Sequence, residues 1–208
     1  MQSDFSNTFP LRSGRVHEVC GPASVGFSAI SVGYENSSVL WIHEKWRAET
    51  VNPVGLNGFF DPSKLLFAHV KDHAEGLAVM EEALRDGVIS CVIFELHKPL
   101  SLTAGRRLQL AAKAGDTTGI CIIQEDMGSN AAETRWHCAP VFASDESDGD
   151  STHQIWKLKK NKSGTLGAWY VQWDQATRRL HMVSPAGKRS DSAQISGRGP
   201  VFAHAEAK

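Results

Sequence analysis

The middle of the chain alternates between short apolar runs and segments predicted to be helices. The strand-like runs are rich in β-branched and large apolar residues and lie at 15–20, 39–44, 65–70, 88–96 and 119–125. The later runs are separated by helices predicted at 72–87 and 103–115. Alternation of strand and helix is typical of right-handed crossovers around a parallel sheet. The sequence therefore predicts an α/β fold with a mostly parallel central sheet flanked by helices.

Both predicted helices have recognisable end signals. Asp72 followed by Glu75 is a capping-box pattern, and Gly87 is a favourable residue for ending the first helix. Thr103 is expected to cap the second helix, which runs to Gly115.

The character of the chain changes after residue 134. A run at 135–143 and three alternating segments at 154–160, 168–174 and 178–184 predict antiparallel strands that extend one edge of the sheet. The acidic stretch 144–153 is expected to be a mobile loop. We therefore expect an N-terminal arm at 1–14, one domain at 15–184 and a flexible C-terminal tail at 185–208.

Composition narrows the possible functions. With 208 residues, a formal net charge of −1 and no long apolar run, the chain has neither a whole-protein attraction to nucleic acid nor a membrane span. The stretch 1–15 lacks the apolar run of a secretory signal, so a cytoplasmic location is expected. The four cysteines form no C-x-x-C pair and the nine histidines no H-E-x-x-H motif. We expect buried free cysteines and no metal site.

The stretch CGPASVGFS at 20–28 has part of a phosphate-binding pattern. Gly21 and Gly26 have the spacing of such a loop and Ser28 supplies the hydroxyl, but Phe27 stands where the pattern has lysine. That lysine neutralises the β- and γ-phosphates, which phenylalanine cannot do. A short helix is expected to follow, which would weaken the anion site further. On this motif alone, a tight strand-to-helix turn is the preferred interpretation, and no nucleotide cofactor is expected.

The order of GRVHEVCGPASVGFS, VLWIHE, DPSKLLFAHVKD and AVMEEALRDGVISCVIFE resembles the RecA-type ATPase core. In that core, the second strand ends in a catalytic glutamate, at the position of Glu44. The Walker B acid that supports Mg²⁺ falls at Glu95. More narrowly, the chain resembles the ImuA family across roughly 15–184, through HEVCGPAS, LTAGRRLQLAAKAG, AAETRW and WKLKKNKSGTLGAWYVQWD. Loss of the phosphate-loop lysine is expected in that family.

The resemblance implies a cytoplasmic, non-catalytic accessory protein of damage-inducible mutagenesis. Its implied partners are ImuB, RecA and an error-prone replicative-type DNA polymerase. The segment 125–134 follows the strand after which RecA has a long DNA-binding loop, and it contains no basic residue. Because phosphate contacts dominate DNA affinity, DNA binding is expected to be weak or absent.

Lys160 and Lys162 match two RecA lysines that reach the ATP of a neighbouring subunit. The resemblance therefore predicts that they bind RecA, whereas the simpler interpretation is a solvated edge strand. Two other functions stay open. One is a weakened ATPase in which Ser28, Glu44 and Glu95 still manage Mg²⁺-nucleotide, and the other is a cell-division inhibitor of the SulA type.

Overall fold

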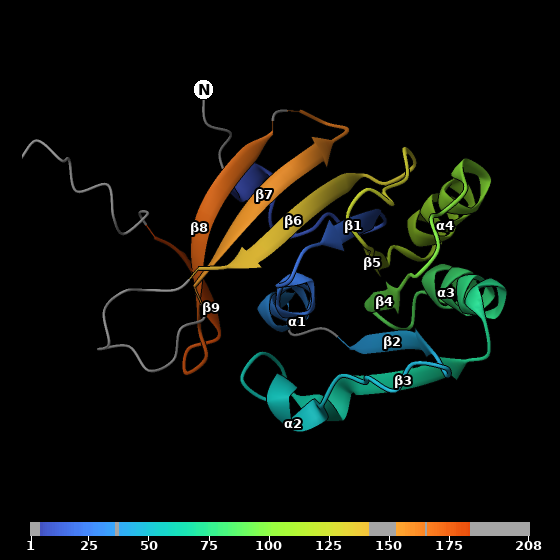
Figure 1. Ribbon diagram of the computed structural model, residues 1–208, viewed down its shortest axis with the longest axis horizontal. Coiled ribbons are helices and arrows are strands. Elements are labelled where there is room, and N and C mark those ends of the chain that lie inside the picture. Colours follow the sequence, from blue (N-terminus) through green and yellow to red (C-terminus); the bar gives the residue numbers. More distant parts are fainter. Residues whose placement is uncertain (1–4, 36–37, 142–152, 165, 184–208) are drawn as a thin grey trace, which may run out of the picture.

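The computed structural model describes residues 5–35, 38–141, 153–164 and 166–183. Within these ranges, the strands form one nine-stranded sheet in the order β3-β2-β4-β5-β1-β6-β7-β8-β9 (Figure 1). The strands are β1 (Val16–Cys20), β2 (Val39–Glu44), β3 (Leu65–Val70), β4 (Cys91–Glu95), β5 (Thr118–Ile122), β6 (Thr134–Pro140), β7 (His153–Asn161), β8 (Gly167–Asp174) and β9 (Arg179–Met182). The predicted α/β class is confirmed.

The parallel part of the sheet comprises β3, β2, β4, β5, β1 and β6. Each neighbouring pair in this part runs in the same direction, as the predicted crossovers require. Glu44 and Glu95 are the last residues of β2 and β4. Both acids therefore lie at the carboxyl edge of the parallel sheet, where α/β proteins form their ligand sites.

The predicted antiparallel extension is confirmed by β6, β7, β8 and β9. Its first strand has two roles, because β6 pairs in parallel with β1 and antiparallel with β7. The ladder between β6 and β7 shifts at a bulge between Arg135 and Trp136. Along β6, β7 and β8, buried residues alternate with more exposed ones, so one face of these strands packs on the core.

Helices cover both faces of the parallel part. They are α1 (Ser24–Glu35), the single turn α2 (Pro53–Leu56), α3 (His73–Asp86) and α4 (Leu102–Gly115), with 3-10 turns at Phe5–Asn7 and Pro62–Lys64. Figure 1 shows α3 and α4 side by side, away from α1. The buried core has two parts, one beneath α1 and the antiparallel strands and one beneath α3 and α4.

The predicted ends of α3 are confirmed. The Asp72 side chain accepts a hydrogen bond from the Glu75 amide at 2.9 Å, and Gly87 ends the helix with φ of 78°. The prediction that Thr103 caps α4 is wrong. Ser101 is the cap, because its hydroxyl accepts the Ala104 amide at 3.1 Å. A helix cap is the residue before the first turn, and its hydroxyl accepts a hydrogen bond from the amide three residues later. Thr103 lies within the first turn of α4, so it does not have that position.

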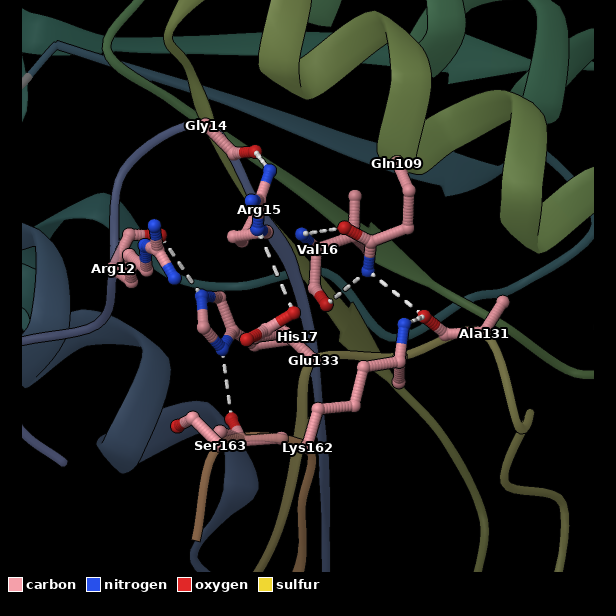
Figure 2. A network of polar contacts seen from close by, with 12 residues as sticks. Arg12, Gly14, Arg15, Val16, His17, Gln109, Ala131, Glu133, Lys162 and Ser163 are labelled. Atoms are coloured by element: carbon pink, nitrogen blue, oxygen red, sulfur yellow. Dashed lines mark hydrogen bonds and ion pairs between the residues drawn. The ribbon is translucent and has the colours of Figure 1, made fainter.

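The N-terminal residues pack closely on the domain. Phe9 and Leu11 are buried in the core beneath α1, and Phe5 packs against it. His17 on β1 holds this segment in place, since its Nε2–H donates to the Arg12 carbonyl oxygen at 3.0 Å (Figure 2). The other ring nitrogen accepts from the Thr134 hydroxyl at 2.7 Å. The described part of the expected arm is thus tied to β1 and β6.

Two expectations concern the remaining segments. The tail predicted at 185–208 lies outside the described residues, as does the predicted mobile loop 144–153 except for His153, which begins β7. Within the described residues, no helix combines the length and the apolar character that crossing a bilayer requires. The prediction of free, buried cysteines is confirmed for Cys20, Cys91, Cys121 and Cys138.

Candidate functional site

The glycine loop joins β1 to α1 as a tight turn. Gly21 has a φ of 91°, and a Cβ atom there would lie 2.5 Å from the carbonyl oxygen of Cys138. The amides of Ala23 and Ser24 donate to the carbonyl oxygens of Cys138 and Gly21, at 3.0 and 3.1 Å. These two donors are therefore used inside the chain, whereas a phosphate-binding loop presents its amides to the ligand.

Helix α1 begins inside the phosphate-loop pattern. Its first residue is Ser24, so Gly26 lies in the first helical turn. A Cβ atom on Gly26 would lie 2.9 Å from Nε2 of Gln154, whose Oε1 accepts from the Trp156 indole at 2.8 Å. The Gln154 side chain therefore packs against the N-terminus of α1. In a functional phosphate-binding loop, phosphate binds at this N-terminus.

The expectation of a short helix after the loop is wrong. Helix α1 has 12 residues, which is an average length, and residues 27–33 are all buried. Burial of a helix face contributes more to helix stability than intrinsic propensity does. The weak helix formers near its end, including Gly33, are therefore tolerated.

Phe27 is a core residue. Its side chain is fully buried, with ring centroids 4.6 Å from Trp156 and 5.4 Å from Trp136. The expectation that this ring packs against the sheet is confirmed. Ser28 is also fully buried, and its hydroxyl donates to the carbonyl oxygen of Ser24 at 2.9 Å. Neither side chain of this pair points to solvent, where a nucleotide would bind.

The two acids at the carboxyl edge have partners within the chain. Glu95 accepts a hydrogen bond from the Trp41 indole at 2.7 Å through Oε1 and forms an ion pair with Arg47 through Oε2. Glu44 accepts from the Trp46 indole at 2.5 Å through Oε2. Glu44 Oε1 is buried and has no hydrogen-bond partner in the described part of the chain.

Arg47 is the ion-pair partner of Glu95, the residue for which the sequence predicts a Mg²⁺-supporting role. Its guanidinium also lies 3.5 Å from the exposed carboxylate of Glu49. An arginine stays protonated at any physiological pH, so it offers Glu95 a permanent positive charge. The carboxylate is thereby satisfied without a metal ion.

Three histidines near these acids have a pKa below the ordinary value for histidine. Burial lowers the pKa of His43, His73 and His97, and it is the largest cause in each case. Glu44 acts in the opposite direction on His73 and His97. Among the residues that the structure describes, no three or more His, Cys, Asp or Glu side chains are arranged to hold a metal ion.

A cavity of about 440 Å³ lies between the start of α1 and the segment 47–59. Val25 and Ala29 line one side, Leu56 and Phe59 line the other, and Arg47 and Glu95 also contribute to its wall. The size is that of an ordinary ligand pocket. Its walls suit an apolar group that carries one polar end.

Lys160 and Lys162 lie together near the opposite edge of the parallel sheet. Their ammonium groups donate to the carbonyl oxygens of Ala132 and Ala131, the latter at 2.6 Å. Figure 2 shows Lys162 beside Ala131. Burial, followed by the charge of Lys162, lowers the pKa of Lys160. The main chain of Lys162 is linked through that of Glu133 to Val16, where β1 begins, whereas the acids lie where strands end.

The sequence interpretation missed three residues of the carboxyl edge and the glycine loop, namely Trp41, Arg47 and Gln154. Trp41 and Gln154 lie in predicted strands, where an indole or amide is ordinarily a packing residue. Arg47 lies in a stretch without periodicity, which offers no signal for its partner. The pairing with Glu95 arises because β2 and β4 are neighbours in the sheet.

Two curated proteins match the chain, and both are named Protein ImuA. They come from Caulobacter vibrioides, from strain NA1000 / CB15N and from strain ATCC 19089 / CIP 103742 / CB 15. Each is 26% identical over 182 residues, which covers 79% of this chain and 73% of the relative. The chain is similar to Protein ImuA. No family model matches it, and the wider likeness to the RecA-type core stays a prediction.

Proposed function

We propose that this chain is a non-catalytic accessory protein of damage-induced mutagenic DNA synthesis. The similarity to Protein ImuA over 79% of the chain supports this proposal. The ImuA family resemblance adds a cytoplasmic location and three partners, which are ImuB, RecA and an error-prone replicative-type polymerase. The protein then acts by contact with these partners and hydrolyses no nucleotide.

The observation that carries the non-catalytic assignment is the burial of Phe27 between Trp136 and Trp156. A phosphate-loop lysine contributes transition-state charge stabilisation worth several kcal/mol, about a hundredfold or more in rate. Here the position supplies no charge, and the Ser28 hydroxyl is bonded to Ser24. Of the two acids at the carboxyl edge, Glu95 forms an ion pair with Arg47.

Nucleotide binding tests this assignment directly. We expect no binding of fluorescent ATP with Mg²⁺ to the purified chain, even at millimolar nucleotide, because the cationic contacts are missing. Binding in the micromolar range would overturn the assignment. It would favour the second candidate, a weakened ATPase, for which the cavity of about 440 Å³ beside Gly26 and Glu95 is the supporting observation.

RecA contact is assigned to Lys160 and Lys162 in this proposal. The lysines lie near the edge of the sheet opposite to Glu44 and Glu95, so one edge can face a partner while the other keeps its internal pairs. On binding, the two ammonium groups would leave the carbonyl oxygens of Ala131 and Ala132 and donate to an anionic group of the partner instead. Both ammonium groups would then keep a hydrogen-bond acceptor. DNA contact is left to the partners, because Glu125 and Asp126 are exposed in the adjoining loop.

Pull-down of purified RecA and ImuB tests the partner assignment. We expect Lys160→Glu combined with Lys162→Glu to abolish RecA retention and to leave ImuB retention unchanged. Lys162→Glu alone covers the possibility that the half-buried Lys160 is needed for folding. The matched control is Arg106→Glu with Lys113→Glu, which reverses two exposed charges on α4, away from β7. Unchanged RecA retention by a folded Lys160 and Lys162 variant would contradict the assignment.

A further inference from the structure

One face of the antiparallel strands is uncovered by any helix in the described part of the chain. The other face packs on α1 and the N-terminal segment through Trp136, Trp156 and Trp169. Helices α3 and α4 pack instead over β1 to β5. In Figure 1 they lie beside β4 and β5, away from β7 and β8. The uncovered face of β6, β7 and β8 is therefore open to a partner.

Lys157 and Lys159 project from this open face. The inward neighbours on β7, Trp156 and Leu158, are buried, whereas both lysines are exposed. Lys157 lies opposite His137 of β6 on one side and Ala168 of β8 on the other. Neither neighbour of Lys157 carries a carboxylate, and both lysines are exposed, so their ammonium groups are accessible.

A groove of about 570 Å³ borders these lysines. Cys20 and Ile123 line it as buried residues, and Glu125 with Asp126 forms the side contributed by the loop after β5. Lys157 and Lys159 line it from β7. The groove thus has one basic side on the sheet and one acidic side on a loop.

The basic groups of the groove differ in whether they are already paired. Arg135 donates to Glu18 at 2.8 Å, and His137 Nε2 lies 2.9 Å from Glu125 Oε1. No hydrogen bond or ion pair joins the ammonium group of Lys157 or Lys159 to another residue in the described part of the chain. The buried Nδ1 atom of His137 likewise has no partner among the described residues. Two ammonium groups without a partner among the described residues therefore line the same groove.

The spacing of the lysines indicates what fits there. Residues two apart on a strand lie about 6.8 Å apart on the same face. An extended peptide presents alternate side chains with the same period, so two of its carboxylates can meet both lysines. We propose that the open face of β6, β7 and β8 docks an extended acidic segment of a partner protein, with carboxylates at alternate positions. This interface goes beyond the proposed function and does not depend on it.

A nucleic acid fits this groove less well. Trp136, Trp156 and Trp169 are buried in the core, so they are not available as stacking platforms for bases. Glu125 and Asp126 on the loop side would repel a chain that carries a phosphate at every unit. A peptide with carboxylates on one side only avoids that repulsion.

Fluorescence anisotropy with synthetic peptides tests the proposal. One labelled probe alternates glutamate and threonine over eight residues, and a second has the same composition with the glutamates in one block. We expect the chain to bind the alternating peptide more tightly than the blocked one. Lys157→Glu with Lys159→Glu should weaken that binding at least about tenfold. Lys113→Glu, an exposed change on α4, should leave it unchanged.

A labelled oligothymidine strand is measured in parallel. A different result is that oligothymidine binds more tightly than the alternating peptide and that the same double variant loses this binding. That result would identify nucleic acid as the ligand of the groove and overturn the proposal. Failure of the alternating peptide to bind, or equal binding by the double variant, would also overturn it. Circular dichroism verifies that the variants are folded. Because Lys157 and Lys159 are exposed, we expect native spectra.

Discussion

The ring of Phe27 meets the indole of Trp156 edge to face, with 4.6 Å between the ring centroids. Edge-to-face contact is a favourable geometry for aromatic pairs and adds to the burial of their apolar surface. Phe9 packs against both rings, at 6.2 and 5.1 Å. Phe27, at the lysine position of the phosphate-loop pattern, thus joins α1, β7 and the N-terminal segment.

Introducing lysine at position 27 should therefore lower the stability of the fold without creating a nucleotide site. Phe27→Lys removes the aromatic contacts and buries an unpaired charge, so we expect a loss of about 3–5 kcal/mol in the free energy of unfolding. Phe27→Leu, which stays apolar, should cost less. Urea unfolding measures both variants, and fluorescent ATP measures binding. A Phe27→Lys protein of native stability that binds ATP would contradict this assignment.

The Arg47 and Glu95 pair should contribute measurable coupling energy. Both groups are largely shielded from solvent, so Arg47→Gln leaves a mostly buried carboxylate with Trp41 as its remaining partner. We expect this variant to lose about 1–3 kcal/mol of unfolding free energy. A double-mutant cycle with Glu95→Gln isolates the pair.

The exposed partner of Arg47 provides the matched control for that cycle. The Glu49 side chain is 90% exposed, so Glu49→Gln should change stability by less than about 0.5 kcal/mol. Equal coupling of Arg47 to Glu49 and to Glu95 would show that burial of the carboxylate does not set the strength of the interaction.

Stability should fall in mildly acidic solution because of His17. Burial lowers the pKa of His17 from 6.5 to about 4, so the unfolded chain binds a proton there before the folded chain does. The stabilisation is complete above about pH 6.5 and is lost as the pH falls to about 4. It corresponds to about 3 kcal/mol. Unfolding midpoints measured across this range report the loss.

The variant His17→Gln identifies the contribution of this histidine. It should reduce the slope of stability against pH between about pH 6.5 and 4. A smaller slope of the same sign should remain, since burial also lowers the pKa of His43, His73 and His97. An unchanged slope in the variant would assign the acid sensitivity to other groups.

Two glycine substitutions should act in opposite directions. A Cβ atom on Gly33 of α1 would overlap the main-chain carbonyl group of Phe59, so Gly33→Ala should lower stability. A Cβ atom on Gly55 of α2 would meet nothing closer than Asn52, at 4.0 Å. Gly55→Ala should raise stability by up to about 1 kcal/mol, because alanine loses less conformational freedom on folding. Thermal melts of the two proteins compare the signs.

The sequence predicts most of the sheet because its strands carry strong local signals. The run predicted at 39–44 ends with β2 at Glu44, and the run predicted at 88–96 extends one residue beyond the end of β4 at Glu95. The Asp72 signal identifies a helix start. The cap of α4 was predicted at Thr103, and Ser101 takes that role. Serine and threonine both suit a cap, so local pattern does not decide between positions two residues apart.

The candidate site was predicted less completely, because its character depends on contacts between distant segments. The burial of Phe27 against the sheet was correctly predicted. Arg47 and Gln154 approach Glu95 and Gly26 through the order of strands in the sheet, and no local pattern reports that order. Burial of Phe9 likewise depends on Phe27 and Trp156, far along the chain.

The place of β1 in the middle of the sheet has a consequence for biosynthesis. Glu18 on β1 bonds to Arg135 on β6, 117 positions later in the chain. As the ribosome delivers the chain from its N-terminus, β1 emerges first and must wait for both of its neighbours, β5 and β6. Pairing between strands that are far apart in the sequence slows folding, and strand edges stay unpaired until it is complete. A nascent chain that stalls before Thr134 would leave one side of β1 bare, inviting aggregation and capture by chaperones.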